Sequence, residues 1–224
     1  MAPGVRYAGA VARTHARRAR WGTGCQTAMA ALRGLEVGDV AAVLTDATAS
    51  LVEYLEVLLD DAAPCCLALS TWSIYRGDMA RLLGHVDAGD VTDLRVIVDR
   101  GFRQRRPDDW AAVVEMLGAD RMREVRLHAK LFVLDGGPGR VWAGASSMNL
   151  NGNSRVENLT VVRDEAIATM YRDLFDLVWD RVAPGEASGV DPLREVLAAG
   201  GSEDGERSLL DAMLDESAED LTWF

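Results

Sequence analysis

The chain has 224 residues, of which 49% are hydrophobic and 26% are charged, proportions that suit one soluble globular domain with extensions. No apolar run approaches the ~20 residues that a membrane-spanning helix requires, and residues 1–22 lack the hydrophobic core of a secretory signal. The three cysteines, Cys25, Cys65 and Cys66, are too few and too unevenly spaced for a disulfide framework. These features predict a cytoplasmic protein and argue against a membrane-inserted or disulfide-stabilised one.

The formal net charge of −11 is concentrated in the C-terminal part of the sequence. Residues 184–224 contain 11 acidic and 2 basic residues, a net of −9, which leaves a nearly neutral −2 for residues 1–183. We therefore expect an N-terminal extension (1–45), a main domain (46–183) and an acidic tail (184–224) that can dock a protein partner. The extension contains a basic arm, which either contacts nucleic acid or is a solvated terminus. Its arginines are Arg13, Arg17, Arg18 and Arg20.

Helical and strand patterns alternate along the main domain. Apolar residues at helical spacing predict helices at 48–61, 76–86, 108–117 and 164–182, with a shorter helix at 26–33. Runs of β-forming residues predict strands at 65–72, 94–99, 125–135, 141–145 and 159–162, and a short strand within 34–45. This order of elements predicts an α/β sandwich with a mixed β-sheet and helices on both faces.

Two features follow directly after expected strands, where open α/β sheets usually bind ligands. Trp72 ends the strand at 65–72 and either contacts a ligand or packs in the core. A basic loop follows the strand at 94–99 and contains Arg100, Arg103, Arg105 and Arg106. We predict that a substrate and its phosphates are bound by Trp72, Arg103, Arg105 and Arg106. The alternative is a solvated loop whose arginines pair with Asp108 and Asp109.

The stretch 126–158 gathers residues that can bind a phosphoryl group or react with one. It contains, in order, His128, Lys130, Asp135, Ser147, Asn149 and Glu157. Side chains alternate along a strand, so His128 and Lys130 should point to the same face of the strand at 125–135. The glycine-rich turn at 136–139 should then bring Ser147 and Asn149 back beside His128. Such a cluster would supply a nucleophile or base, a fixed cation and neutral hydrogen-bond donors.

Two facts of composition strengthen this interpretation. Lys130 is the only lysine among 24 basic residues, and all four asparagines lie between Asn149 and Asn158. Arginine does not replace lysine where a compact point charge must lie among phosphate oxygens. The alternative, a polar sheet edge without catalytic function, would require neither the single lysine nor the clustered asparagines.

The pattern H-x-K-x4-D followed by G-S-x-N resembles the signature of the phospholipase D superfamily. His128, Lys130 and Asp135 match its first half completely. In the second half, alignment on Asn149 places Ser146-Ser147 at the G-S pair, with Gly144 two residues earlier. The resemblance covers roughly residues 50–182 and is strongest to small bacterial members with one motif per chain, typified by a metal-independent endonuclease. It implies a phospholipase D-like α/β/α sandwich and a phosphodiesterase.

This resemblance also implies a role for each residue of the motif. His128 is expected to attack phosphorus and form a covalent phosphohistidine, while Lys130 and Asn149, with Ser147 as a further donor, stabilise the phosphoryl oxygens. Glu157 is expected to orient the His128 ring. Asp135, at the far end of its strand, is expected to have a structural, hydrogen-bonding role. No Cys/His set or carboxylate cluster has metal-site spacing, so we expect no metal and no cofactor.

The charged segments and the histidines indicate the substrate and the partners. A nuclease acting on DNA or RNA is favoured by the basic loop and the basic arm. The alternatives are a phospholipid phosphodiesterase or phosphatidyltransferase, and a non-catalytic regulatory protein with the same fold. His15 and His85 lie in no motif, so the second histidine that the chemistry requires should be His128 of another subunit. We therefore expect a homodimer, with interface candidates Asn151, Asn153 and Arg155.

Overall fold

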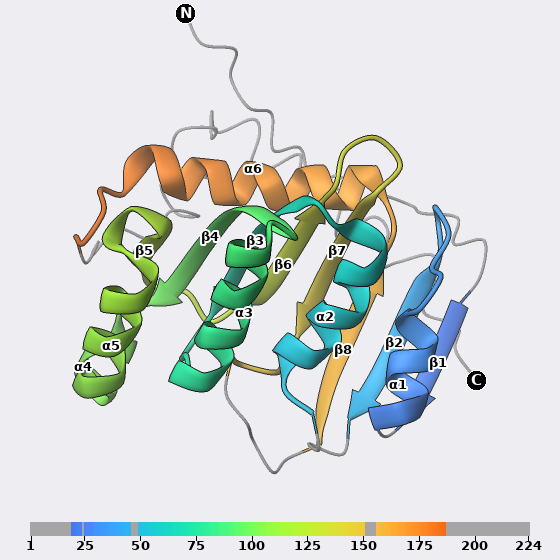
Figure 1. The fold of residues 1–224 in the computed structure, drawn as a ribbon, viewed down its shortest axis with the longest axis horizontal. Helices are drawn as coiled ribbons and strands as arrows, with labels where there is room; N and C mark the ends of the chain where they lie inside the picture. The colour runs from blue at the N-terminus through green and yellow to red at the C-terminus, as the bar shows by residue number, and fades with distance from the viewer. Residues whose placement is uncertain (1–18, 24, 46–48, 151–155, 187–224) are drawn as a thin grey trace, which may run out of the picture. The chain divides into compact units, whose positions relative to one another are not determined.

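The computed structural model describes residues 19–23, 25–45, 49–150 and 156–186 (Figure 1). These residues belong to one compact unit, Thr14–Gly189. The expected acidic tail and most of the basic arm, including Arg13, Arg17 and Arg18, lie outside the described residues.

The described part of the chain forms an eight-stranded sheet with the order β1-β2-β8-β7-β6-β3-β4-β5. Its strands are β1 (Ala19–Thr23), β2 (Val40–Thr45), β3 (Cys65–Thr71), β4 (Val91–Asp99), β5 (Met122–Val125), β6 (Lys130–Asp135), β7 (Val141–Ser146) and β8 (Glu157–Val162). Neighbours β1–β2, β3–β4 and β4–β5 are parallel, and the other neighbours are antiparallel. The mixed sheet predicted from the sequence is confirmed. Its geometry brings the carboxyl ends of β2, β3, β4, β5 and β7 and the amino ends of β6 and β8 to one edge, here called the carboxyl edge.

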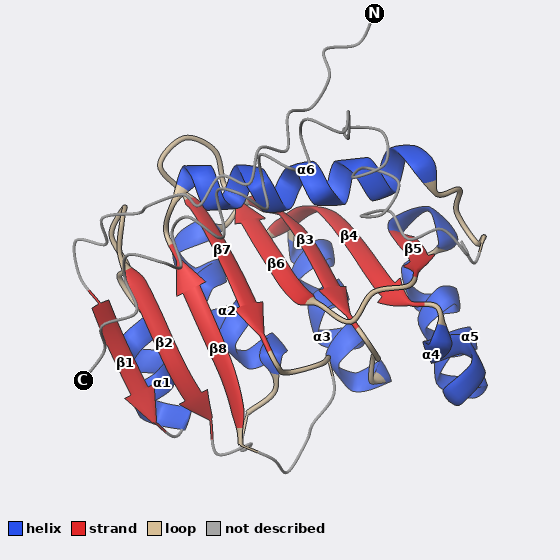
Figure 2. Cartoon of the chain, turned by 180° about the vertical axis from the view of Figure 1, so that it is seen from behind, coloured by secondary structure: helices blue, strands red, loops and turns tan. Residues whose placement is uncertain are grey.

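Helices cover both faces of the sheet (Figures 1 and 2). The helices are α1 (Cys25–Leu32), α2 (Leu51–Ala62), α3 (Arg76–Ala88), α4 (Gly101–Arg105), α5 (Pro107–Leu117) and α6 (Glu165–Arg181), with a 3-10 turn at Ala119–Arg121. Residues of α1, α2, α3, α4 and α5 share one hydrophobic core with one face of the sheet, and α6 packs on the other. Strand alternation explains the division: on β4, Val96 and Val98 join the first core, whereas Ile97 joins the second.

The long helix α6 follows from its sequence. Asp164 caps its amino end, because the Asp164 carboxylate accepts hydrogen bonds from the backbone N–H groups of Ala166 and Ile167, both at 3.0 Å. Ala168, Phe175 and Val178 are buried along one side at helical spacing. Among the described residues, α6 is therefore the helix that packs on this face of the sheet.

The prediction of one strand at 125–135 is wrong. Only residues 130–135 of this run form a strand, β6, which pairs with β3 and β7. Val125 is instead the last residue of β5, which pairs with β4 at the end of the sheet. Residues 126–129 form a loop that passes the carboxyl ends of β4 and β3 to reach β6 (Figure 2). His128 lies in this crossing loop, and the alternation of side chains along a single strand does not apply to it.

Two further segments differ from expectation. Most of the expected basic loop is the short helix α4, and the end of the expected basic arm is strand β1. Arg20 of β1 donates hydrogen bonds to the carbonyl oxygens of Arg33 (2.6 Å) and Gly34 (2.9 Å). Its guanidinium also lies 3.7 Å from the buried carboxylate of Asp39. Arg20 thus holds the turn between α1 and β2, which explains why this basic residue is part of the folded unit.

Gly144 lies at a close approach within the sheet. On β7 it stands opposite Phe132 of β6, and a Cβ added to Gly144 would come 2.2 Å from the Phe132 ring. We expect Gly144→Ala to lower the free energy of unfolding by about 1–3 kcal/mol, the usual cost of overpacking a core. Urea unfolding measures the change. Gly84→Ala is the matched control, because nothing lies within 4 Å of the added Cβ on α3. Equal stabilities of the two variants would contradict the prediction.

Candidate active site

The crossing loop is fixed at the carboxyl edge by polar groups of β3 and β4. Ser70 Oγ donates to the carbonyl oxygen of Ala129 (3.0 Å) and accepts from the N–H of Leu131 (2.9 Å). The carboxylate of Asp99, at the end of β4, accepts from the N–H of Leu127 (3.3 Å). These bonds hold the backbone on both sides of His128, although the His128 side chain is exposed.

Lys130 places a buried ammonium group against His128. Only 7% of Lys130 is exposed, and its Nζ donates to the His128 carbonyl oxygen at 2.9 Å. The same Nζ lies 3.3 Å from each nitrogen of the His128 ring. Burial lowers the pKa of Lys130, and the nearby carboxylates of Glu157 and Asp99 act in the opposite direction. The only lysine of the chain is therefore a positioned charge beside the histidine and not a surface residue.

Asn149 is oriented by the end of β3. Its side-chain oxygen accepts a hydrogen bond from the N–H of Trp72 (3.1 Å), and Thr71 Oγ1 lies 3.4 Å from the same oxygen. The neighbouring backbone is also held, because the N–H of Leu150 donates to Thr71 Oγ1 (3.2 Å). With its oxygen engaged, the Asn149 side chain has its NH₂ group as the donor for another molecule.

Ser147 and Glu157 contact each other at the adjacent ends of β7 and β8. Ser147 Oγ donates to the Glu157 carboxylate and accepts from the N–H of Asn158 (2.9 Å). Ser146 Oγ instead donates to the Asn158 carbonyl oxygen at 2.7 Å. Ser147 thus positions Glu157, whose charge acts on Lys130. The expected contact between Glu157 and the His128 ring stays a prediction.

Trp72 and Arg105, two of the predicted substrate-binding residues, lie beside His128. The Trp72 and His128 rings meet edge to face, with centroids 5.7 Å apart and an angle of 61°. Arg105 Cζ lies 3.8 Å from the Trp72 ring centroid. The Arg105 guanidinium also donates to the Trp72 carbonyl oxygen and to Asp99, both at 3.1 Å. Stacking and hydrogen bonds therefore fix an arginine, a tryptophan and the histidine in one row.

The other two predicted substrate-binding residues make different contacts. The Arg103 guanidinium donates to the buried carboxylate of Glu124 (2.6 Å), and its Cζ lies 3.9 Å from the Trp110 ring centroid. Arg106 forms an ion pair with Asp109 (2.7 Å), as the alternative interpretation of the basic loop expected. Neither of these contacts involves the residues around His128, so the substrate-binding roles of Arg103 and Arg106 stay predictions.

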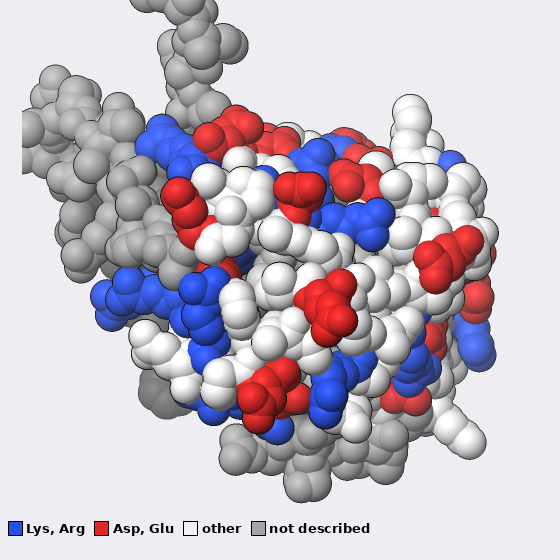
Figure 3. All heavy atoms as spheres, turned by 60° about the vertical axis from the view of Figure 1, so that its left-hand side comes forward, with Lys and Arg blue, Asp and Glu red and all other residues white. Residues whose placement is uncertain are grey.

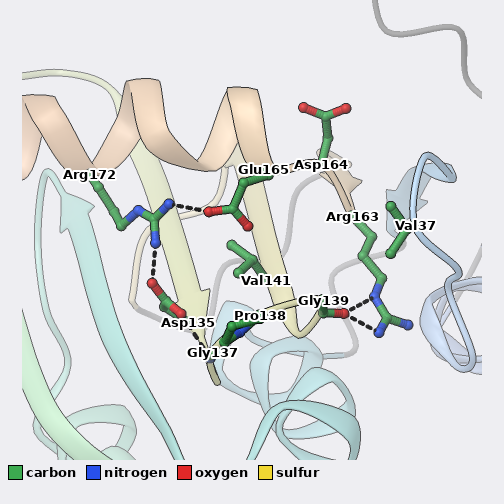
Figure 4. Close-up of a pocket in the computed structure, with 10 residues that line it drawn as sticks. All are labelled: Val37, Asp135, Gly137, Pro138, Gly139, Val141, Arg163, Asp164, Glu165 and Arg172. Carbon is green, nitrogen blue, oxygen red and sulfur yellow. Dashed lines mark hydrogen bonds and ion pairs between the residues drawn. The ribbon is translucent and has the colours of Figure 1, made fainter.

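Asp135 lies at the other end of β6, at the opposite edge of the sheet (Figure 4). Its carboxylate accepts from the N–H of Gly137 (2.9 Å) and forms an ion pair with Arg172 of α6, which also binds Glu165. A hollow of about 670 Å³ at this edge is lined by Val37, Asp135, Gly137, Pro138, Gly139, Val141, Arg163, Asp164, Glu165 and Arg172. This hollow and the residues around His128 are thus separate places on the molecule.

The second histidine and the dimer interface were the two remaining expectations. His85 lies near the carboxyl end of α3 and contacts Asp90 (2.9 Å) and Glu56 (3.5 Å). Because α3 leads away from the carboxyl edge, His85 is not part of the group around His128. The interface candidates Asn151, Asn153 and Arg155, and also His15, lie outside the described residues.

Asp99 is the residue of this site that the sequence did not reveal. Its carboxylate accepts from the N–H of Gly101 (3.0 Å) as well as from Arg105 and Leu127, so it links α4 to the crossing loop. The available signal was its place as the first polar residue after the buried run of β4, where ligand-binding side chains usually follow a strand. With 35 acidic residues in the chain, that signal alone did not distinguish Asp99.

No helix among the described residues is both long enough and apolar enough to cross a membrane. No group of three or more His, Cys, Asp or Glu side chains among the same residues is placed to hold a metal ion.

Several solved structures have a similar fold. Nuc from Salmonella typhimurium, a phospholipase D family member, is 15% identical over 65% of this chain and 97% of its own, with a TM-score of 0.48. NucT from Helicobacter pylori is 12% identical over 65% of this chain and 99% of its own, with a TM-score of 0.44. TrmBL2, an archaeal chromatin protein, is 13% identical over 65% of this chain and 54% of its own, with a TM-score of 0.43. No family model and no curated protein matches the sequence. At these identities the likeness is one of fold alone, and the mixed sheet with helices on both faces is the architecture that the sequence predicted.

Proposed function

We propose that the protein is a phosphodiesterase of the phospholipase D type, and more specifically a metal-independent nuclease that acts through His128. The observation that carries this proposal is the position of Lys130. Its buried ammonium group lies 3.3 Å from both nitrogens of the exposed His128 ring. A phosphoryl group bound at this place would contact a nucleophile and a cation at the same time. The presence of Lys130 in a chain with no other lysine favours a chemical role over a structural one.

The proposed reaction has two steps. In the first, a His128 ring nitrogen attacks phosphorus, the phosphorus–nitrogen bond forms, and the bond to the leaving oxygen breaks as that oxygen takes a proton from a general acid. In the second, water attacks phosphorus and gives a proton to the group that acted as the general acid, and the phosphorus–nitrogen bond breaks to release the histidine. In both steps the Lys130 ammonium and the Asn149 NH₂ group stabilise negative charge on the phosphoryl oxygens. Glu157, held by Ser147, orients the His128 ring.

Nucleic acid is the substrate that the surroundings of His128 favour. Trp72 and Arg105 offer an aromatic ring and a guanidinium beside the proposed nucleophile, and both groups bind nucleotides well. One observation favours the lipid alternative. Leu44, Tyr75 and Val156 are 52%, 55% and 76% exposed at or near the carboxyl edge, and such side chains could contact acyl chains.

The proposed function is tested by incubating the protein with plasmid, single-stranded DNA, RNA and phospholipid vesicles, with EDTA present throughout. We expect cleavage of at least one nucleic acid and no release of the phospholipid head group. The proposed nucleophile and charge-stabilising groups are all side chains, so chelation should not reduce the rate. Head-group release without nucleic-acid cleavage would favour the lipid alternative. A loss of activity in EDTA that Mg²⁺ or Zn²⁺ restores would contradict the proposed mechanism.

The protein should be active as a homodimer. The reaction needs one histidine to attack and a second to protonate the leaving oxygen, whereas His85 is bound to Asp90 and Glu56. Two-fold symmetry would place the same surface of each subunit at the interface, so that both His128 residues approach one phosphate. Light scattering over a dilution series, with activity followed in the same samples, measures the mass. A fully active monomer would contradict the prediction.

A further inference from the structure

Most arginines near the carboxyl ends of β4 and β5 have a carboxylate partner. Arg103 pairs with Glu124, Arg105 with Asp99, and Arg106 with Asp109. Figure 3, which brings this side of the unit forward, shows basic and acidic residues interspersed over most of the visible face. The charges of these arginines are neutralised within the fold. An arginine without a carboxylate partner is therefore a candidate to bind another molecule.

Arg100 and Arg126 are the exceptions at this place. Both side chains are exposed, and among the described residues neither guanidinium has a hydrogen bond, an ion pair or a ring contact. They directly follow the parallel strands β4 and β5, whose last residues, Asp99 and Val125, are paired in register. The N–H of Arg100 donates to the Val125 carbonyl oxygen at 2.8 Å, so the two backbones are still adjacent where the arginines begin.

This arginine pair lies next to His128. Arg126 precedes His128 by two residues, and two residues of chain span at most about 7 Å. Arg100 is held close as well, because the carboxylate of the preceding Asp99 accepts from the N–H of Leu127, the residue between Arg126 and His128. The pair therefore extends the positive charge of Lys130 outward along the ends of β4 and β5.

Two neighbouring cations without a carboxylate repel each other, and neither contributes an ion pair to the fold. An anion bound between the two guanidinium groups would remove the repulsion. Guanidinium groups bind phosphate oxygens through two parallel hydrogen bonds, which makes a phosphate a well-suited ligand.

We propose that Arg100 and Arg126 form a second phosphate-binding subsite, which holds the phosphate next to the one that His128 attacks. This inference rests on the proposed function and makes it more specific, because it selects a substrate with consecutive phosphodiesters. A polynucleotide presents such a neighbouring phosphate on the same molecule, whereas a phospholipid presents a single phosphodiester. The substrate is therefore a nucleic-acid chain that passes over the ends of β4 and β5.

The test compares a polymer with a single phosphodiester. The double variant Arg100→Gln/Arg126→Gln is assayed with a labelled single-stranded oligonucleotide and with bis(4-nitrophenyl) phosphate. We expect KM for the oligonucleotide to rise about tenfold, and kcat/KM for the oligonucleotide to fall at least fivefold more than for the small diester. Loss of two phosphate contacts should also reduce the slope of log affinity against log salt by about 1.4 for a single strand.

Arg121→Gln is the matched control, because Arg121 is exposed and directly precedes β5, at the opposite end of the strand from Arg126. It removes one charge from the same region and should leave both substrates unaffected. Thermal unfolding of all variants checks the fold, and the two single variants replace the double variant if that protein is unstable. An unchanged oligonucleotide KM and salt slope would overturn the proposal, as would an equal loss on both substrates.

Failure of the subsite and failure of the proposed function give different results. If the wild type cleaves neither substrate, the proposed function is wrong, and fluorescence anisotropy with the labelled oligonucleotide still tests the subsite. Salt-dependent binding that is weaker in the double variant than in Arg121→Gln supports the subsite. Equal binding by the two variants overturns it.

Discussion

We expect His128→Ala to abolish phosphodiester cleavage and to leave the fold intact. The proposed nucleophile is lost, and the rate should fall by about 10⁴-fold or more, the scale of removing a nucleophile from other enzymes. The fold should survive, because His128 is exposed and its ring contacts only Lys130 and the edge of Trp72 in the described structure. Single-turnover assays measure the rate, and mass spectrometry of acid-free quenched samples detects a phosphohistidine adduct in the wild type alone.

His85→Gln is the control for this experiment. It removes His85 of α3, the other histidine of the described residues, which contacts Asp90 and Glu56. Cleavage within about twofold of wild type is expected, because surface ion pairs contribute little. A folded His128→Ala protein with activity within a few-fold of wild type would disprove the proposed mechanism.

Lys130→Arg should lower the rate by at least ~100-fold, although the charge is retained. Lys130 is 7% exposed, and its Nζ fits between the His128 carbonyl oxygen at 2.9 Å and the His128 ring. A guanidinium is longer and planar, so it must displace the ring or leave the buried position. Steady-state kinetics with circular dichroism as a check of the fold measures the effect.

Lys130→Met separates charge from shape in the same assay. If the position of the ammonium is what matters, the Met and Arg variants lose activity to a similar extent, within about tenfold of each other. A nearly unaffected Lys130→Arg protein would show that any positive charge suffices there, and would remove the main support for the proposed site.

The sequence predicted those features that depend on local pattern. Helices such as α2 and α6, and the strands β3 and β7, follow from periodicity and β-forming residues, and the structure has them within a few residues of the expected bounds. The interruption between β5, which ends at Val125, and β6, which begins at Lys130, was not predictable in this way. The β-forming residues of this run belong to β6, which pairs with β3 and β7. In β5, with the sequence MREV, only Val125 is a strong β-former, so its pairing with β4 and not its composition makes it a strand.

The same limit applies to the site. Lys130 and Asn149 could be selected from residue type and spacing, because one lysine and four clustered asparagines are unusual in 224 residues. The ion-pair partners of Arg103 and Arg105 could not be predicted, because Glu124 lies on β5 and Asp99 on β4. No local sequence pattern indicates such pairs. The sequence therefore identified an excess of positive charge after β4, but not which guanidinium groups are already neutralised.

The length of β6 gives the spacing of the motif a physical meaning. Its six residues cross the sheet from Lys130 at the carboxyl edge to Asp135 at the opposite edge, about 17–20 Å at the usual rise of a strand. The interval in H-x-K-x4-D thus measures the width of a sheet and not the reach between two reacting groups. An inserted residue would turn every later side chain to the other face, separating Asp135 from Arg172 or Lys130 from His128. Lys130 and Asp135, which the sequence presents as parts of one motif, are thus the two ends of one strand. Lys130 contacts His128 at one end, and Asp135 is held by Arg172 at the other.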